Sequence, residues 1–206
     1  LYERSDPYRL ALPGGAVDLT HTRFEQHTPR AVRVGGTRWI EAPAYTLKLE
    51  GAARVGFRTL TLDEKYGGPG VDSLTAAIVC EELAVGDLGV SAIVAQQAKF
   101  VQMMQWTLPE EVCRKHLIPF RDDDRFLIAA CASEPHAGSD VLSGRPDLRL
   151  RTTAVLDGDT WVINGVKQWS TGGSAAKLLR VVARTDKGNG HVLVPRDTPG
   201  FSVDHD

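Results

Sequence analysis

The hydrophobic pattern of the chain changes near residue 122, and this change constrains the fold more than any other feature. Before it, apolar residues recur every three or four positions, as they do on one face of a helix. After it, short apolar runs are separated by glycine and aspartate turns, which is typical of strands. The sequence therefore predicts an α+β protein, with a helical domain over residues 47–122 and a β-domain over residues 123–206.

Helices are predicted at four places, and three of them carry recognisable start or stop signals. Asp72 or Ser73 can cap the second helix, because a short polar side chain accepts a hydrogen bond from the first free amides. Gly56 would end the first helix, and Pro119 would end the fourth. The expected ranges are 46–55, 72–85, 90–104 and 107–118.

Strands are predicted throughout the second part of the chain. Their spacing, with Gly/Asp turns between them, favours an antiparallel barrel or sandwich. Residues 1–46 are expected to be irregular, since proline and glycine interrupt every candidate helix, although residues 31–34 alternate as a strand does. The expected strands are 126–131, 148–156, 160–164, 178–184 and 191–194.

Composition and charge limit the classes of protein. A formal net charge of −2 and a pI near 6.3 give no overall bias toward nucleic acid. The 3 cysteines are an odd number at wide spacings, so we interpret them as reduced, buried thiols of a cytoplasmic protein. No apolar run has the length of a membrane span, and the first residues do not resemble a signal peptide.

Several catalytic motifs are absent from the sequence. It contains no GxGxxG, GxxxxGK[ST], HExxH or GxSxG, and its 6 histidines lack the spacing of metal ligands. Nicotinamide-dependent, nucleotide-hydrolysing and zinc-dependent enzymes are therefore unsupported, and no metal site is predicted.

Two segments carry the residues best suited to bind a ligand. The run 131–140 follows a predicted strand and ends in hydroxyl and glycine residues, which would expose backbone N–H groups at the rim of a sheet. The run 164–173 contains Trp169. Two interpretations remain open for each segment. The first run either forms a ligand-binding rim or is an ordinary surface turn. Trp169 either lines a cofactor site or packs in the core.

These segments resemble the acyl-CoA dehydrogenase family. Residues Ser133–Asp140 match its [ST]-E-P-x-A-G-S-D turn, and Gly158–Lys167 match G-D-x-[WY]-x-[IL]-N-G-x-K. Residues Trp169–Thr171 match W-I-T, with Ser170 in place of isoleucine. The resemblance covers residues 47–206, whereas residues 1–46 do not resemble the first helix of the family.

The resemblance implies FAD as cofactor and an acyl-CoA thioester as substrate. It also implies the family fold, a helical domain followed by a β-barrel or sandwich. Hydrogen bonds to the flavin ring would tune its redox chemistry. The flavin-binding residues implied are Cys131, Ala132, Ser133, Gly138, Ser139, Trp169, Ser170 and Thr171, and Ser139 would also contact the substrate.

The implied activity is the α,β-dehydrogenation of an acyl-CoA in fatty acid metabolism, with electron-transfer flavoprotein as acceptor and a dimeric or tetrameric enzyme. In the family the catalytic glutamate comes from a C-terminal helical bundle, so no catalytic residue is assigned here, and Glu134 belongs to a structural turn. We therefore interpret the chain as a fragment or as a subunit completed by a partner chain. The alternatives are a non-catalytic subunit and a flavin monooxygenase or oxidase on the same fold.

Residues 141–151 form a longer connection than the family usually has between its first two β-domain strands. One interpretation is a loop insertion, because loops absorb extra length at little cost. The other is that Arg145, Arg149 or Arg151 meets a phosphate of CoA, which suits the fork of a guanidinium.

Overall fold

A computed structural model of the chain describes residues 9–12, 15–18, 32–34, 38–40, 50–138, 140 and 149–203. The chain divides into two compact units, Leu1–Arg58 and Thr59–Asp206. In the first unit β1 (Arg9–Leu12) pairs antiparallel with β2 (Gly15–Asp18), and β3 (Val32–Val34) pairs antiparallel with β4 (Arg38–Ile40). The irregular structure expected for residues 1–46 therefore does not extend to these strands. Residues 50–54, at the end of the first predicted helix, are helical.

Three helices stand at the start of the second unit, after the short 3-10 helices η1 (Phe57–Thr59) and η2 (Glu64–Tyr66). They are α2 (Ser73–Gly86), α3 (Leu88–Thr107) and α4 (Glu110–Asp122). Asp72 caps α2 as predicted, because its side chain accepts from the amide of Thr75 at 2.7 Å. The prediction that Pro119 ends α4 is wrong. Its missing N–H removes one helical bond, but its carbonyl accepts from the amide of Asp123 at 3.2 Å, and Phe120 is fully buried.

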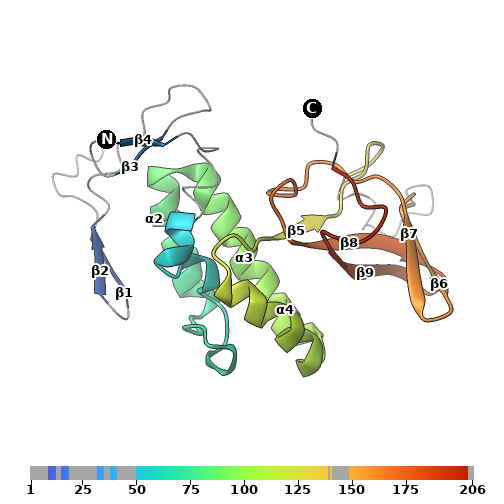
Figure 1. Ribbon diagram of the computed structural model, residues 1–206, viewed down its shortest axis with the longest axis horizontal. Helices are drawn as coiled ribbons and strands as arrows, with labels where there is room; N and C mark the ends of the chain where they lie inside the picture. Colours follow the sequence, from blue (N-terminus) through green and yellow to red (C-terminus); the bar gives the residue numbers. More distant parts are fainter. Residues whose placement is uncertain are drawn as a thin grey trace. The chain divides into compact units, whose positions relative to one another are not determined.

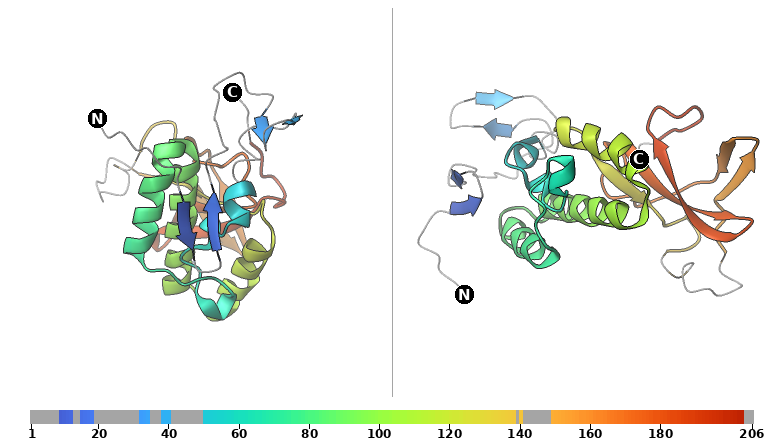
Figure 2. Two further views of the ribbon diagram at one scale, coloured as in Figure 1. Left: turned by 90° about the vertical axis from the view of Figure 1, so that its left-hand side faces the viewer. Right: turned by 90° about the horizontal axis from the view of Figure 1, so that it is seen from below.

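The remaining strands form one mixed sheet around β8 (Leu178–Thr185) (Figure 1). β8 pairs antiparallel with β9 (Gly188–Pro195), and parallel with β5 (Ile128–Cys131). β6 (Thr153–Asp157) and β7 (Thr160–Asn164) form a hairpin that joins β8 at the pair Thr153 and Arg184. Figure 2 shows this hairpin extending away from the helices of the same unit.

The α+β class is thus confirmed, but the sheet is not wholly antiparallel as expected. β5 and β8 are parallel because the chain between them is long enough to make a crossover, and it contains the β6–β7 hairpin. The other predicted strands differ mainly at their ends. The range 148–156 shortens to β6, and 191–194 lengthens to β9.

An apolar core joins the helices to the sheet. Burying a large aliphatic or aromatic side chain contributes roughly 1.5–3 kcal/mol, so this core fixes the start of β5 against α3 and α4. Its buried members come from the loop before α2, from α3, from α4 and from two strands: Leu62, Tyr66, Phe100, Val101, Met104, Cys113, Leu117, Phe120, Ile128 and Leu178.

A buried glutamine also links α3 to β5. The side chain of Gln97 donates from Nε2 to the carbonyl of Ile128 at 3.0 Å, and its Oε1 accepts from the amide of Ile128 at 2.8 Å. Gln97 is only 2% exposed, so both bonds are shielded from water. The strand that leads into the candidate site is therefore held by a polar contact as well as by apolar packing.

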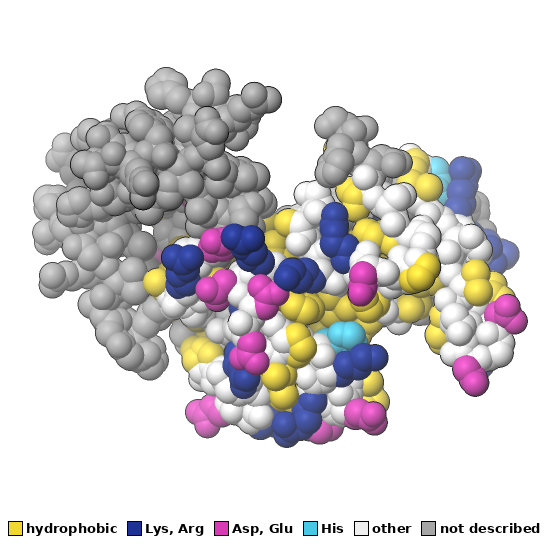
Figure 3. Space-filling model, viewed as in Figure 1, with side chains coloured by type: hydrophobic (Ala, Val, Ile, Leu, Met, Phe, Trp, Pro, Cys, Tyr) yellow, Lys and Arg dark blue, Asp and Glu magenta, His cyan; other side chains and the backbone are white. Residues whose placement is uncertain are grey.

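On the face shown in Figure 3, acidic and basic side chains are mixed over the helices of the second unit. Within the described residues, no helix has both the length and the apolar character needed to cross a membrane. No cluster of three or more histidine, cysteine or acidic residues suited to a metal ion occurs in this part of the chain.

Candidate functional site

The chain leaves the sheet at Cys131 and folds into a tight turn. The amide of Glu134 donates to the carbonyl of Ala137 at 2.8 Å, and the amide of Ala137 donates back to Glu134 at 3.1 Å. This pair of bonds closes residues 134–137 into a small loop at the end of β5. The Glu-Pro sequence therefore serves first to turn the chain.

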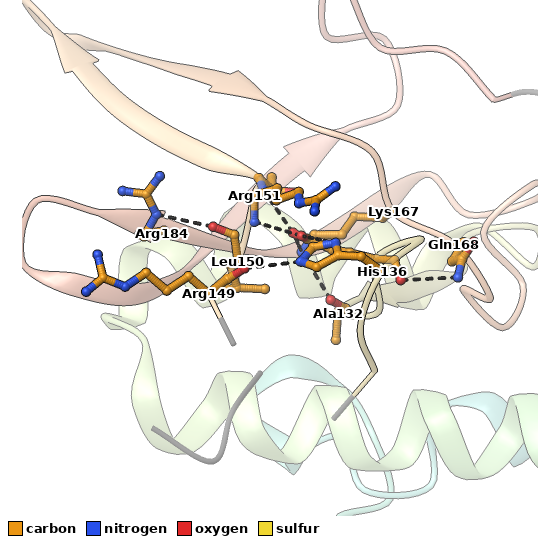
Figure 4. A network of polar contacts seen from close by, with 10 residues as sticks. Ala132, His136, Arg149, Leu150, Arg151, Lys167, Gln168 and Arg184 are labelled. Carbon is orange, nitrogen blue, oxygen red and sulfur yellow. Dashed lines mark hydrogen bonds and ion pairs between the residues drawn. The ribbon is translucent and has the colours of Figure 1, made fainter. Parts of the chain in front are cut away.

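The buried side chain of Glu134 joins the turn to two other segments, those that carry Arg151 and Lys167. Figure 4 shows Arg151 and Lys167 close together beside Ala132. The Oε1 atom of Glu134 accepts from Lys167 Nζ at 2.8 Å and from the amide of Thr152 at 2.9 Å, and its Oε2 accepts from the amide of Arg151 at 2.7 Å. The side chains of Glu134 and Lys167 are 1% and 9% exposed. We call Glu134, Lys167 and the amides of Arg151 and Thr152 the Glu134 cluster.

The ionisation of Glu134 reflects this cluster. Burial by itself would raise the pKa of its carboxyl group, but the bonds from Lys167, Thr152 and Arg151 outweigh burial and lower the pKa to about 2. The group is thus a carboxylate at neutral pH, and its acceptors are already engaged. Such a carboxylate holds structure in place and is a poor proton acceptor.

Lys167 and Gln168 bring the second predicted segment to the end of β5. Lys167 Nζ also donates to the carbonyl of Ala132 at 3.1 Å. The amide of Gln168 donates to the carbonyl of Ser133 at 3.0 Å, and its side chain donates to the carbonyl of Glu134 at 3.1 Å. Neither residue was among the predicted site residues, although Lys167 ends the second motif and Gln168 directly precedes Trp169.

A glycine permits this close approach. A Cβ atom on Gly165 would lie 2.6 Å from the Cα atom of Thr152, which is far inside normal contact distance. The segment 165–168 can therefore lie against residue 152 only with glycine at this position. The N-G-x-K motif consequently has a steric basis in the fold.

Trp169 stands out from the surface beside this junction. Its side chain is 84% exposed, so it does not pack in the core of this chain. It has a φ of 58°, and it is the only non-glycine residue with positive φ in the described part of the chain. A left-handed backbone is unfavourable for a large side chain and is concentrated at functional sites. Thr171 is also exposed, and Ser170 is half-buried.

Unpaired donors lie at the end of β5, close to Trp169. Ala132 and Ser133 are half-buried, and the amide and hydroxyl of Ser133 have no hydrogen-bond partner among the described residues. Half-buried donors of this kind suit the polar edge of a ligand. Burial raises the pKa of the Cys131 thiol, which a hydrogen bond with Ser170 only partly offsets.

The structure therefore brings together most of the predicted flavin-binding residues, from two segments far apart in sequence. Cys131, Ala132 and Ser133 meet the segment that carries Trp169, Ser170 and Thr171. Gly138 is exposed just beyond the turn, and Ser139 lies outside the described residues. Their contact with a cofactor or substrate remains a prediction.

Comparison with protein families matches two domain models in order along the chain. The N-terminal domain of acyl-CoA dehydrogenases matches residues 25–120, and the middle domain matches residues 129–206. The first match begins at residue 25, so the similarity starts earlier in the chain than residue 47, where the motifs alone placed it.

Related proteins are named as dehydrogenases of CoA thioesters. The chain is 35% identical over 153 residues to a probable acyl-CoA dehydrogenase of Mycobacterium leprae, an alignment that covers 72% of this chain and 38% of that protein. It is 33% identical over 156 residues to a mitochondrial isobutyryl-CoA dehydrogenase of Dictyostelium discoideum, covering 73% and 36%.

Solved structures agree. A crystal structure of a glutaryl-CoA dehydrogenase from Mycobacterium smegmatis in complex with FADH2 matches with a TM-score of 0.68 and 29% identity. The match covers 77% of this chain and 39% of that one. The chain thus spans well under half the length of the relatives that it matches. Because both domain models match in order and a probable acyl-CoA dehydrogenase is 35% identical over 72% of this chain, the chain belongs to the acyl-CoA dehydrogenase family.

Proposed function

We propose that this chain forms the flavin- and thioester-binding part of an FAD-dependent acyl-CoA dehydrogenase. The observation that supports this most directly is the junction of two segments, in which Gln168 and Lys167 bind the backbone of Ala132, Ser133 and Glu134. The junction places the exposed Trp169 beside the unpaired donors of Ser133. The flat indole ring of Trp169 and the two unpaired donors of Ser133 together suit a flavin.

The residues present fit such a cofactor. The amide and hydroxyl of Ser133 would donate to the polar edge of the ring, while the indole of Trp169 would cover part of its surface and exclude water. The hydroxyl of Thr171 would donate near the reacting nitrogen. Donors at these positions favour an electron-rich ring. When bound, FAD would accept the hydride that leaves the β-carbon of the substrate.

Glu134 is not the base in this proposal. Its carboxylate is buried, it accepts bonds from Lys167 and two amides, and its pKa is about 2. A base must reach the proton that it removes, and an acceptor already bound by three donors cannot do so. We propose that the base is the glutamate that the family supplies from its C-terminal helical bundle, and we assign no residue of this chain to that role.

Further parts of the proposal rest on the family resemblance. They are the domain boundary near residue 122, contact of Ser139 with both flavin and substrate, and electron-transfer flavoprotein as acceptor. A cytoplasmic location, a part in fatty acid metabolism, and a dimeric or tetrameric assembly belong with them.

The test is flavin binding followed by reduction. The chain is prepared with FAD, alone and together with any protein that co-purifies with it from its native source, and acyl-CoA is added without oxygen. A yellow preparation that loses its colour supports the proposal. A yellow one that keeps its colour favours an oxidase or monooxygenase, and a colourless one in both forms contradicts flavin binding.

A substitution at the unpaired donors makes this test residue-specific. Ser133→Ala removes one hydroxyl donor and should weaken FAD binding by roughly fivefold, since one hydrogen bond contributes about 1 kcal/mol. Ser174→Ala is the matched control, because Ser174 is an exposed serine beyond the predicted flavin-binding residues of that loop. Equal FAD dissociation constants for the two variants would argue against Ser133 as a flavin ligand.

A further inference from the structure

The segment that carries Trp169 forms a tight loop before β8. We call residues 169–176 the Trp169 loop. Within it, the amide of Gly173 donates to the carbonyl of Ser170 at 2.8 Å, and two further amides donate to the carbonyl of Gly172 at 3.1 and 2.9 Å. These bonds set the shape of the loop, but they do not join it to another part of the chain. Its position in the β-domain therefore depends on other contacts.

Arg196, which directly follows β9, binds the Trp169 loop. Its Nη1 donates to the carbonyl of Gly173 at 3.1 Å and to the carbonyl of Ala176 at 3.2 Å. Its amide donates to the carbonyl of Lys177 at 3.0 Å, directly before β8 begins. The side chain and the backbone of one residue thus bind three carbonyls, two in the loop and one where the loop enters β8.

The surroundings of the Arg196 guanidinium suit this contact. Among the described residues it forms no ion pair, and the two carbonyls are its only hydrogen-bond acceptors. Its Cζ lies 5.9 Å from the centre of the Phe201 ring, which packs against an apolar cluster of β5, β8 and β9. Arg196 is half-buried, and a hydrogen bond from a charged donor contributes more than a bond between neutral groups. The guanidinium therefore stabilises the position of the loop.

The loop residues that the proposed function needs are not held by their own side chains. Trp169 is 84% exposed, and Thr171 is exposed as well. The loop also lies against α3, because a Cβ atom on Gly172 would be 3.6 Å from Cδ1 of the buried Ile93. The directions of Trp169 and Thr171 therefore follow from the backbone of the loop, which α3 and Arg196 hold in place.

We propose that Arg196 is a positioning residue that holds the Trp169 loop in the geometry needed to bind the flavin. The inference rests on the proposed function, because it requires a flavin beside Trp169. Without the guanidinium, the carbonyls of Gly173 and Ala176 lose their donor, and the loop adopts additional positions. Only the fraction of chains with the loop in place then binds FAD tightly, which lowers the apparent affinity. The hydroxyl of Thr171 would also lie less often near the ring, so the electron-rich reduced flavin would be stabilised less.

Hydrogen exchange in the FAD-free chain tests the contact itself. In Arg196→Gln the amides of Gly173 and Ala176 should exchange roughly tenfold faster, because the loop opens more readily once two bonds from a charged donor are lost. Arg121→Gln on α4 is the matched control. It removes the same charge and a bond from Nη1 to the carbonyl of Tyr66 at 2.9 Å, and it should leave these loop amides unchanged. Unchanged exchange in Arg196→Gln, or equal acceleration in Arg121→Gln, would overturn the proposal.

Flavin binding tests whether the position of the loop matters for function. In the preparation that binds FAD, Arg196→Gln should raise the FAD dissociation constant roughly tenfold, as expected if about one chain in ten keeps the loop in place. FAD restores the loop only in part, so at saturating FAD the midpoint potential of the bound flavin should be lower than in the wild type. Arg121→Gln should match the wild type in both measurements. A purely structural role would lower stability to urea and leave the potential unchanged, which contradicts the proposal.

Arg196→Lys keeps a cation near the same carbonyls, and it decides the question if the glutamine variant does not fold. Its ammonium lacks the planar fork of a guanidinium, so exchange, FAD affinity and flavin potential should lie between those of the wild type and Arg196→Gln. A folded lysine variant that equals the wild type in all three measurements would show that Arg196 does not position the loop.

The outcomes separate this inference from the function on which it rests. If the wild type binds no FAD in any preparation, the proposed function fails, and the role of Arg196 toward the flavin fails with it. If the wild type binds FAD and acyl-CoA bleaches it, but both Arg196 variants keep the wild-type affinity and potential, only the role of Arg196 is overturned.

Discussion

Glu110 and Glu134 each collect several donors, but in opposite surroundings. Glu110 stands at the start of α4 with its side chain 48% exposed, and accepts from Tyr66 at 2.8 Å and from Lys65 at 3.0 Å, while Arg114 lies 2.9 Å away. Glu134 is 1% exposed, and two of its donors are backbone amides. The Glu110 carboxylate is bound by solvated side chains, whereas the Glu134 carboxylate is bound away from water by one lysine and two backbone amides.

The difference shows how the two parts of the second unit are held. The helical part depends on an apolar core. Its surface ion pairs contribute little to stability, because water screens the charges. The candidate site has few large apolar residues, so its three segments depend on buried polar contacts instead. Removing one partner of a buried pair leaves the other charge without compensation, which is costly.

The largest effect is expected from Glu134→Gln. It leaves the ammonium of Lys167 buried without a counter-charge, and it should lower the free energy of unfolding by about 3–5 kcal/mol. Glu110→Gln is the matched change on the helical side and should cost much less, because its partners remain solvated. Urea denaturation of both variants measures this, and equal losses would contradict the comparison.

The pH dependence of stability should show the same contrast. The pKa of Glu134 is lowered from 4.5 to about 2, so its carboxylate stabilises the folded state above pH 4.5, and this contribution disappears as pH falls toward 2. The loss amounts to about 3 kcal/mol, from about 1.4 kcal/mol for each unit of pKa. Urea denaturation at several pH values should show this fall in the wild type. A Glu134→Gln variant with the same acid profile would refute the assignment.

A pair of glutamines on α3 repeats the comparison without charge. Gln97→Leu leaves the amide and carbonyl of Ile128 buried and unpaired, and should cost about 2 kcal/mol. Gln105 makes the same kind of pair, with the amide of Asp63 at 2.7 Å and the carbonyl of Thr61 at 3.0 Å, but water can reach its contacts more easily. Gln105→Leu should therefore be milder in thermal or urea unfolding. The opposite order would show that burial does not set these costs.

The smallest effect on stability is expected from Trp169→Ala. An 84% exposed side chain contributes little packing, so the free energy of unfolding should change by no more than about 0.5 kcal/mol. Affinity for FAD should fall clearly, if the indole covers the flavin. Trp106→Ala, at a 74% exposed position on α3, should change neither stability nor FAD affinity, which flavin fluorescence titration can test. A large loss of stability at Trp169 would show that the side chain is structural.

Local signals predicted the presence of the helices and the strand 160–164, because these elements are specified by neighbouring residues. Asp72 marks the start of α2 through its own hydrogen bond, and residues 160–164 form β7 as expected. The failure at Pro119 came from tertiary context, since burial of Phe120 outweighs the missing helical bond. Parallel pairing of β5 with β8 depends on contacts between distant segments, which periodicity cannot show.

The motifs located the candidate site, but they did not predict the hydrogen bonds that join its segments. The motifs marked Ser133 and Trp169, which the fold does bring close together. They did not show that Lys167 and Gln168 make the junction, nor that a glutamine of α3 reaches β5. The sequence does show a polar residue, Gln97, within the apolar run 90–104. Its hydrogen-bond partner depends on which strand packs against α3, and the sequence alone does not reveal that strand.

The contact between Gln97 and Ile128 has a consequence for how the protein behaves in a crowded solution. Among the described strands, β5 pairs with β8 alone, and a strand with one neighbour offers its free amides and carbonyls to any other extended chain. At Ile128 these groups are already taken by the glutamine amide, which imitates a neighbouring strand. The side chain that positions the strand thus also protects it from self-association and aggregation.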